Sequence, residues 1–438
     1  MTDYLYDYKR KLIPKDDVIK FIHDGDRVLC HGGAESFLGT MDKNIESLHD
    51  VRLYTIFLLT EYYRFLEDNY RDNIRHHAAF VSGPVRQAIK KGHHPEINIC
   101  HYSDTDRYVA NMCRPNVMAC QATPMDEAGY FYMGYNSMGH RAAIDMAERV
   151  IVQVNTKLPK IYGESNKVHI SEVTAIYEED TPMPIMTPPP FNEVDLRAAK
   201  MIAERIPDGA TLQIGVGRVP DAIGEFLGDH QHLGVHTELF TQSLMKLMKK
   251  GVIDNSRKTL MPGKTIFAFA GDTRASQELY DYCDCNPLLE MHPIGWVNSP
   301  YAIRQNNMMY SINSAISVDL TGQVCAESIG LSIYSGTGGQ LDFVRGALKS
   351  KGGRSFIVIN SVAEKKDGTK VSKINLALPY GSAVTTPRAD VDCIATEYGI
   401  AELKYKSLSE RAHALIEIAH PEFRDELEFE ARKAGYFI

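Results

Sequence analysis

The stretch IAERIPDGATLQIGVG, residues 202–217, decides the fold, because the same pattern stands 184 residues earlier as VIKFIHDGDRVLCHGG, residues 18–33. Each copy indicates an amphipathic helix, an Asp-Gly turn, a short apolar strand and a glycine loop at the end of that strand. Two glycines let the backbone turn tightly and bring amide N–H groups close to a ligand. The two copies predict two related α/β units.

Helices and short apolar strands alternate through the rest of the chain. Residues 141–149 and 342–349 each predict a helix that leads into a buried strand. Ser407 and Glu410 have the spacing of a capping box, which predicts a helix running to about residue 419. Such alternation is typical of open, mainly parallel sheets covered by helices. We therefore expect an α/β fold of two similar α/β/α domains, with ligands beyond the carboxyl ends of the strands.

A proline-rich segment separates the two halves. Five prolines lie between Thr181 and Pro190, and proline continues neither a helix nor a central strand. We predict a linker at residues 181–193 between an N-terminal domain, residues 1–180, and a C-terminal domain, residues 194–438. Both lengths are usual for one domain.

The bulk composition excludes several classes of protein. A net charge of −8 argues against nucleic acid as the main partner. No run approaches the ~20 apolar residues of a membrane helix, and the N-terminus lacks the apolar core of a signal peptide, so we expect a cytoplasmic protein that does not bind membranes. The eight cysteines lack the paired spacing of zinc sites, and we interpret them as free thiols.

The glycine loop at residues 215–220 allows three interpretations. Its amides could hold a phosphate or the oxyanion of an acyl-transfer intermediate. Alternatively, Glu238 follows Gly215 by 23 residues, which approximates a dinucleotide fingerprint. Pro220 argues against that fingerprint, because it occupies the position where a third glycine would pack helix against strand. The third interpretation is a plain structural turn.

Three histidines, His230, His232 and His236, precede Glu238. A metal site is one interpretation, but the spacing fits neither an i, i+4 helical pair nor alternate positions of one strand face, and no acidic cluster accompanies it. A turn from helix to strand is the favoured interpretation. Taken alone, Glu238 resembles an ordinary surface carboxylate, and we expect no metal site.

Several ordered blocks point to one family. They are PMDEAGYF (124–131), HTE (236–238), ELYD (278–281), INSAISVDLTGQ (312–323), GTGGQLDF (336–343), TEYGIA (396–401) and HPEFR (420–424). Together with the glycine loop, these blocks resemble the class I coenzyme A transferases of the acetyl-CoA hydrolase/transferase family. Within that family the chain is most similar to the 4-hydroxybutyrate CoA-transferases of fermenting bacteria.

The resemblance implies a function and a set of catalytic residues. It implies transfer of CoA between a short-chain acyl-CoA, such as acetyl-CoA or butyryl-CoA, and a carboxylate such as 4-hydroxybutyrate. The family's nucleophile, which would carry a glutamyl-CoA thioester, falls on Glu238. Its oxyanion-hole amides fall on Val216 and Gly338, its orienting asparagine on Asn298 and a supporting glutamate on Glu397. The resemblance also implies a homodimer that uses CoA as a substrate and holds no permanent cofactor.

Further residues are expected to contact the substrates. The expected CoA contacts are Gly215, Val216, Gly217, Arg218, Val219, Gly336, Gly338, Gly339, Lys373 and Gly381. The expected contacts of the acyl group or carboxylate are His31, Gln213, Met308 and Tyr310. Core packing and satisfied structural polar groups remain competing interpretations for the second set. An acetyl-CoA hydrolase that uses the same glutamate, and a non-catalytic binding module on this fold, remain the alternative functions.

Overall fold

The computed structural model describes residues 4–30, 33–56, 60–185, 190–271 and 274–437, and the chain divides into two compact units. The first unit comprises Met1–Ile185, Ala268–Ala270 and Ser276–Trp296. The second comprises Met186–Phe267, Gly271–Ala275 and Val297–Ile438. The boundary at residue 185 falls within the proline-rich segment. The chain then returns twice to the first unit, with residues that the sequence had placed in the C-terminal domain.

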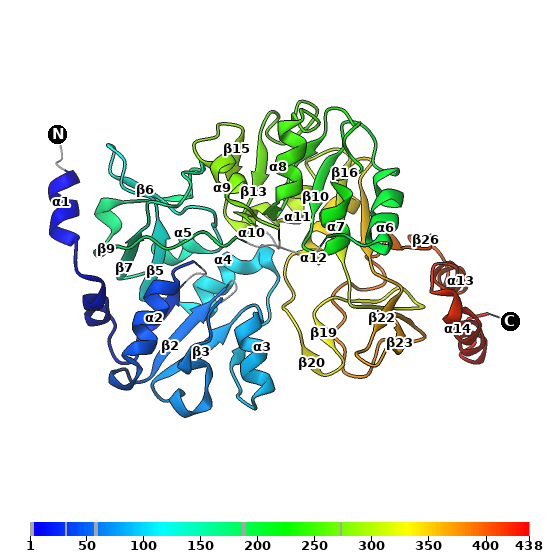
Figure 1. Cartoon of the computed structure of the whole chain (residues 1–438), viewed down its shortest axis with the longest axis horizontal. Helices are drawn as coiled ribbons and strands as arrows, with labels where there is room; N and C mark the ends of the chain where they lie inside the picture. The colour runs from blue at the N-terminus through cyan, green and yellow to red at the C-terminus, as the bar shows by residue number, and fades with distance from the viewer. Residues whose placement is uncertain (1–3, 31–32, 57–59, 186–189, 272–273, 438) are drawn as a thin grey trace. The chain divides into compact units, whose positions relative to one another are not determined.

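The first unit is built on a seven-stranded parallel sheet in the order β4-β3-β2-β1-β5-β7-β9. Figure 1 labels β2, β3, β5, β7 and β9 of this sheet. Its strands are β1 (Arg27–Cys30), β2 (Val51–Thr55), β3 (Ile74–Ala78), β4 (Glu96–Ile97), β5 (Val117–Ala122), β7 (Arg149–Val154) and β9 (Ala175–Glu178). An antiparallel pair, β6 (Tyr130–Tyr132) and β8 (Lys167–His169), forms a separate small sheet. Its α-helices are α1 (Tyr4–Lys11), α2 (Glu35–Lys43), α3 (Gly83–Lys90), α4 (Thr105–Tyr108), α5 (His140–Ile144) and α9 (Gln277–Cys283). Two late strands, β14 (Phe269–Ala270) and β15 (Leu289–Met291), also belong to this unit.

The second unit is built on a six-stranded sheet in the order β11-β10-β16-β21-β25-β26. Its strands are β10 (Thr211–Ile214), β11 (Gly234–Val235), β16 (Met309–Ser314), β21 (Arg354–Val358), β25 (Cys393–Thr396) and β26 (Gly399–Glu402). All neighbours are parallel except β25 and β26. Its helices are α6 (Glu193–Ala203), α7 (Arg218–Ile223), α8 (Gln242–Lys249), α11 (Pro300–Ile303), α12 (Gln340–Lys349), α13 (Leu408–Glu417) and α14 (Pro421–Lys433), and α10 (Ile294–Val297) spans the unit boundary.

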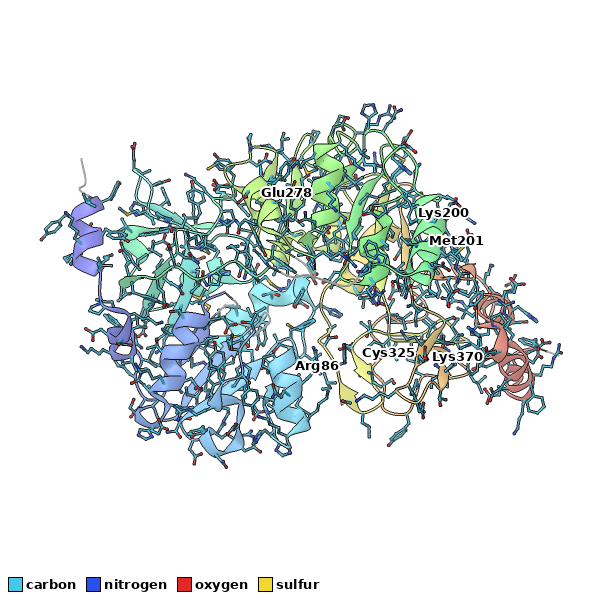
Figure 2. The ribbon with its side chains drawn as sticks, in the orientation of Figure 1. Arg86, Lys200, Met201, Glu278, Cys325 and Lys370 are labelled. Atoms are coloured by element: carbon cyan, nitrogen blue, oxygen red, sulfur yellow. The ribbon has the colours of Figure 1, made fainter. Side chains whose placement is uncertain are left out.

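Small sheets complete the second unit. A three-stranded sheet joins β18 (Val324–Cys325), β17 (Ser317–Asp319) and β24 (Ile374–Asn375). Two antiparallel pairs are formed by β19 (Ser328–Ile329) with β20 (Ser332–Ile333), and by β22 (Val362–Glu364) with β23 (Lys370–Ser372). Figure 2 labels Cys325 and Lys370 on these strands. The short strands β12 (Leu239–Phe240) and β13 (Thr265–Phe267) follow Glu238 in the chain.

The repeated pattern produces the same strand and turn in both units. Gly25 and Gly209 adopt φ values of 78° and 76°, which explains why both turns carry glycine. The helical part differs between the copies. Residues 193–203 form the α-helix α6, whereas residues 15–21 form a 3-10 helix that buries only Val18. The expectation of an α-helix before β1 is therefore wrong: a segment of seven residues that buries one apolar side chain gains too little from packing to stabilise an α-helix.

The predicted elements elsewhere are present with shifted ends. The helix expected at 141–149 ends at Ile144, and Arg149 instead opens β7, where it donates to Asp26 over 2.7 Å. Ser407 and Glu410 form the predicted capping box of α13. The α/β fold class with open, mainly parallel sheets is confirmed. All eight cysteines are free, and none of the helices in the described ranges has the length and apolar character needed to cross a bilayer.

Candidate active site

Glu238 lies on a short connection whose backbone is held by neighbouring segments. The Thr237 N–H donates to the carbonyl of Ile266 over 2.9 Å, and the His236 N–H donates to Leu212 over 3.1 Å. The buried ring of His236 contacts the carbonyl oxygen of Val297 through Nε2 at 2.7 Å. Because Val297 immediately precedes Asn298, this histidine also holds the backbone before the asparagine.

The carboxylate of Glu238 lies between Asn298 and Gly339. The side-chain amide of Asn298 donates to Glu238 Oε2 over 2.6 Å. Gly339 stands so close to both side chains that a Cβ atom there would overlap Asn298 Nδ2 and Glu238 Oε2. Asn298 is fully buried, whereas Glu238 keeps partial exposure. Thus three residues that the resemblance assigned to one site do meet in space.

The surroundings of Glu238 alter its acidity. Burial raises the pKa of Glu238 to about 7; the hydrogen bond from Asn298 opposes this shift, and the negative charge of Asp342 adds to it. Asp342 lies in the first turn of α12 and is itself buried. A carboxyl group with such a pKa is poorly solvated as an anion and is partly protonated near neutral pH, a perturbation that is common at functional sites.

The glycine loop after β10 packs tightly against the end of β16. Gly215 donates its N–H to the Ile312 carbonyl over 2.8 Å, and a Cβ atom on Gly215 would overlap Asn313 Oδ1. Gly217 has φ 148° and would place a Cβ atom on the hydroxyl of Ser314. Val216, at the tip between them, is 52% exposed. Both glycines are therefore required for the loop to lie against its neighbouring strand.

A chain of contacts joins this loop to Gly339. Ser314, which lies against Gly217, accepts a hydrogen bond at its carbonyl oxygen from Gln340 Nε2 over 2.7 Å. Gln340 directly follows Gly339 at the start of α12, and Thr386 donates to its Oε1 over 3.0 Å. The glycine loop and the segment before α12 are thus joined through Ser314 and Gln340, and the second of these segments lies against Glu238.

Gln213 and Asn313 form a buried reciprocal pair beneath the glycine loop. Gln213 Nε2 donates to Asn313 Oδ1 over 3.1 Å, and Asn313 Nδ2 donates to Gln213 Oε1 over the same distance. The amide of Gln213 is therefore satisfied within the protein and supports the loop. Its expected partner in substrate binding, His31, lies outside the described residues.

Glu397 and Lys373 share a second cluster, centred on Ser361. Ser361 donates to Glu397 through its N–H over 3.0 Å and through its hydroxyl over 2.5 Å, and its carbonyl accepts the Lys373 N–H over 2.9 Å. Burial lowers the pKa of Lys373, and the charge of Glu397 opposes that shift. Among the described residues, no hydrogen bond or ion pair links this cluster to Glu238.

Other predicted residues have partners other than Glu238. Arg218 forms an ion pair with the buried carboxylate of Asp195 at 2.7 Å, so its charge is already balanced. Met308 precedes β16 and Tyr310 is its second residue, which places both at the opposite end of the strand from the glycine loop. Tyr310 stacks on Phe356 there, as a core residue would. Met308 and Tyr310 are not brought to the carboxylate.

The remaining predicted positions lie in α7 and in loops. Val219 is buried in α7, Gly338 has φ 62°, and Gly381 lies against Leu331. Gly336 precedes Thr337, whose hydroxyl donates to Glu327 over 3.1 Å. The same glutamate accepts a hydrogen bond from the hydroxyl of Thr385 over 2.9 Å, so it ties two of these loops together.

The three histidines before Glu238 have separate partners. His230 contacts the carbonyl of Ile206 at 3.0 Å, and His232 contacts Asp254 at 2.7 Å. His236 supports Val297 as described above. They are therefore parts of turns and of the site's scaffold, and they do not converge on one point.

Asp342, Ser314 and Gln340 are the site residues that the motifs did not single out individually. All three lie within blocks quoted for the resemblance, at 312–323 and 336–343. The two blocks therefore indicate these segments, but no spacing rule shows which residue within a block lies near the site.

Comparison with known proteins identifies the family of the chain. The family model of the acetyl-CoA hydrolase/transferase N-terminal domain matches residues 1–187, and that of the C-terminal domain matches residues 275–431. The chain is 38% identical to the 4-hydroxybutyrate coenzyme A transferase of Clostridium kluyveri, over 97% of this chain and 98% of that protein.

Two solved structures are similar over almost the whole chain. RipA from Yersinia pestis has a TM-score of 0.92 and 34% identity, covering 100% of both chains. The 4-hydroxybutyrate CoA-transferase from Porphyromonas gingivalis has a TM-score of 0.81 and 32% identity, covering 99% of this chain and 100% of that one. With both domain models matched in order along its length, the chain belongs to the acetyl-CoA hydrolase/transferase family.

Proposed function

We propose that this protein transfers coenzyme A between a short-chain acyl-CoA and a carboxylate, with Glu238 as the nucleophile. The observation that supports the proposal is the environment of the Glu238 carboxylate. It accepts a hydrogen bond from the side-chain amide of Asn298 over 2.6 Å, lies against Gly339 and has a pKa raised to about 7. Similarity to a 4-hydroxybutyrate coenzyme A transferase supports 4-hydroxybutyrate as one acceptor, with acetyl-CoA or butyryl-CoA as donor.

The first half-reaction makes a covalent enzyme intermediate. The Glu238 carboxylate attacks the thioester carbonyl and expels CoA thiolate, which leaves an acyl-glutamyl anhydride. The thiolate then attacks the glutamyl carbonyl and expels the first carboxylate, which leaves a glutamyl-CoA thioester. The second carboxylate reverses both steps and frees Glu238. Electron pairs and charges balance throughout, and the relay consumes no redox equivalent.

Each addition places negative charge on a carbonyl oxygen. The amides near Val216 and Gly338 would supply hydrogen bonds to that oxygen, and losing one such donor typically costs about 3 kcal/mol of transition-state stabilisation. Asn298 would hold the carboxylate in position for attack. Glu397 and Lys373 would support binding from their separate cluster. We propose CoA as a substrate and no permanently bound cofactor.

The test is to trap the thioester. The protein is incubated with acetyl-CoA and treated with borohydride, and peptides are mapped by mass. We expect Glu238 to be reduced to the alcohol, and Glu238→Ala to remove both the adduct and the activity. Unmodified Glu238 together with activity in Glu238→Ala would contradict the proposal. Transfer is then separated from hydrolysis by product analysis with and without 4-hydroxybutyrate. Transfer forms the acyl-CoA of the added carboxylate, whereas hydrolysis releases free CoA without it.

Two further properties follow from the resemblance and remain proposals. We propose a homodimer, which light scattering on the purified protein tests, and a cytoplasmic location, which cell fractionation tests. A monomeric mass or recovery outside the cytoplasm would contradict them.

A further inference from the structure

Three arginines lie in register across neighbouring strands of the first unit. Arg27 pairs with Arg52 between β1 and β2, and Arg52 pairs with Arg75 between β2 and β3. Adjacent parallel strands are about 4.8 Å apart, and residues paired in register share one face of the sheet. The three arginine side chains therefore leave the same face of the sheet in one row across the strands.

This face borders a cavity of about 560 Å³. We call it the arginine cavity, and its lining residues are Arg27, Arg52, Tyr54, Arg75, His77, Asn111, Met112 and Arg114. Its size lies within the range of about 300–1,000 Å³ that is usual for small-molecule sites.

No carboxylate is among the residues that line the arginine cavity in the described part of the chain. Asp26, next to Arg27, accepts hydrogen bonds from Arg149 and Asn116 over 2.7 and 2.8 Å. Glu96 is paired with Arg71. Four arginines thus line one cavity that has no carboxylate among its described lining residues, in a protein whose net charge is −8. The guanidinium group of Arg27 also donates to the carbonyl oxygens of Cys113 and Met112, so Arg52, Arg75 and Arg114 are the arginines for which the described residues show no such bond.

Two buried nitrogens beside the cavity lack partners among the described residues. His77 is 8% exposed and stacks on Tyr54 with ring centroids 4.6 Å apart, and its Nε2 has no hydrogen-bond partner. Arg75 Nε is also unpaired. Since buried polar groups are normally satisfied, these atoms indicate room for an acceptor. Burial lowers the pKa of His77, and the positive charges of Arg52 and Arg75 lower it further. The hydrogen bond with Asn98 and the charge of Glu96 oppose this shift.

The position of the cavity separates it from the glycine loop of the first unit. Arg27, Arg52 and Arg75 open or nearly open their strands, whereas Gly33 follows the carboxyl end of β1. The arginines therefore lie at the amino edge of the sheet, opposite the edge at which parallel sheets usually bind ligands.

We propose that the arginine cavity binds a phosphate-bearing anion with two or more negative charges. Guanidinium groups match phosphate oxygens with paired hydrogen bonds, and several of them in one cavity favour a multiply charged ligand. Two sources share this chemistry: the phosphorylated nucleotide end of coenzyme A and a separate nucleoside diphosphate. The inference does not depend on Glu238.

The test is titration calorimetry of the full chain with pyrophosphate and with ADP. We expect saturable binding that weakens at least about tenfold in Arg52→Gln and in Arg75→Gln, since each loses a charge-assisted pair of hydrogen bonds. Arg10→Gln, which removes an arginine 62% exposed on α1, is the matched control and should bind as the unchanged protein does. Circular dichroism confirms that each variant is folded.

Absence of saturable binding in the unchanged protein would overturn the proposal, and so would equal loss in Arg10→Gln.

Two kinetic outcomes identify the source of the ligand, and both support the site. If Arg52→Gln raises KM for acyl-CoA and ADP competes with acyl-CoA, the ligand is the nucleotide end of coenzyme A. If KM is unchanged while ADP binding is lost, it is a separate nucleotide. The two proposals fail separately. If pyrophosphate and ADP do not bind but the Glu238 adduct still forms, only this inference is wrong. If they bind but no Glu238 adduct forms, only the proposed reaction is wrong.

Discussion

The side-chain amide of Asn298 donates to Oε2 of Glu238 over 2.6 Å, although the two residues are 60 positions apart. His236, two residues before the glutamate, holds the carbonyl of Val297, one residue before the asparagine. One short segment thus positions both the carboxylate and its donor. Changes at either residue should therefore alter the acidity or the position of the carboxylate.

Activity should depend on ionisation of Glu238. Burial raises the pKa of Glu238 to about 7, and only the ionised carboxylate attacks. We expect kcat/KM for acyl-CoA to rise about tenfold per pH unit below pH ~7 and to level above it. A pH profile from about 5.5 to 8.5 measures this. A profile already level at its acidic end would show that Glu238 ionises as an ordinary glutamate does.

Asn298→Ala should move the midpoint of that profile upward. The Asn298 hydrogen bond favours the ionised form, so its loss raises the pKa of Glu238 further. We also expect kcat to fall by a factor of about ten or more, because the carboxylate loses its positioning donor. Asn306→Ala, which removes another buried asparagine of the same unit, is the control and should leave the midpoint in place.

Asp342→Asn should move the midpoint in the opposite direction. The negative charge of Asp342 raises the pKa of Glu238, so neutralising it lowers that pKa. The pH profile of this variant is compared with those of the unchanged protein and Asn298→Ala. A shift of both variants in the same direction would contradict the electrostatic account.

Gly339→Ala should abolish most activity while leaving the fold intact. The added methyl group would overlap both Glu238 Oε2 and Asn298 Nδ2, so the carboxylate must move. We expect kcat/KM to fall at least about a hundredfold, since small displacements of reacting groups cost that much. Gly228→Ala is the control, because a Cβ atom there meets nothing within 4 Å. Near-normal turnover in Gly339→Ala would refute the geometry.

Glu238→Gln should stabilise the protein at alkaline pH. A glutamate whose pKa rises from its usual value of 4.5 to about 7 on folding favours the folded state fully below pH 4.5, and that contribution is lost as pH rises through 7. The gain from Glu238→Gln should reach up to about 3 kcal/mol above pH ~8. Thermal unfolding at about pH 5 and about pH 8.5 measures it. An equal change in Tm at both pH values would contradict the raised pKa.

Much of the architecture could be predicted from local pattern. Residues 211–214 and 27–30 are strands because each is a short apolar run bounded by a glycine turn. The ends of helices were less predictable. Arg149 looks helical by sequence, but its backbone pairs with Val117 of β5, which makes it the first residue of β7, and its side chain meets Asp26. The return of residues 276–296 to the first unit was not visible either, because membership of a core depends on distant contacts.

The sequence by itself determined the two α/β units, the glycine loops and, through ordered motifs, the glutamate of interest. These depend on local backbone preferences and on spacing, which the chain carries wherever it lies. Only the tertiary structure decided the contacts of Glu238: it brings Asn298 and Gly339, which the motifs had named, and Asp342, which they had not, to the carboxylate from distant parts of the chain. It also placed Tyr310 at the far end of β16. The physical reason is that the pKa of a side chain and the groups it can contact depend on its neighbours in space, and only folding brings those neighbours together.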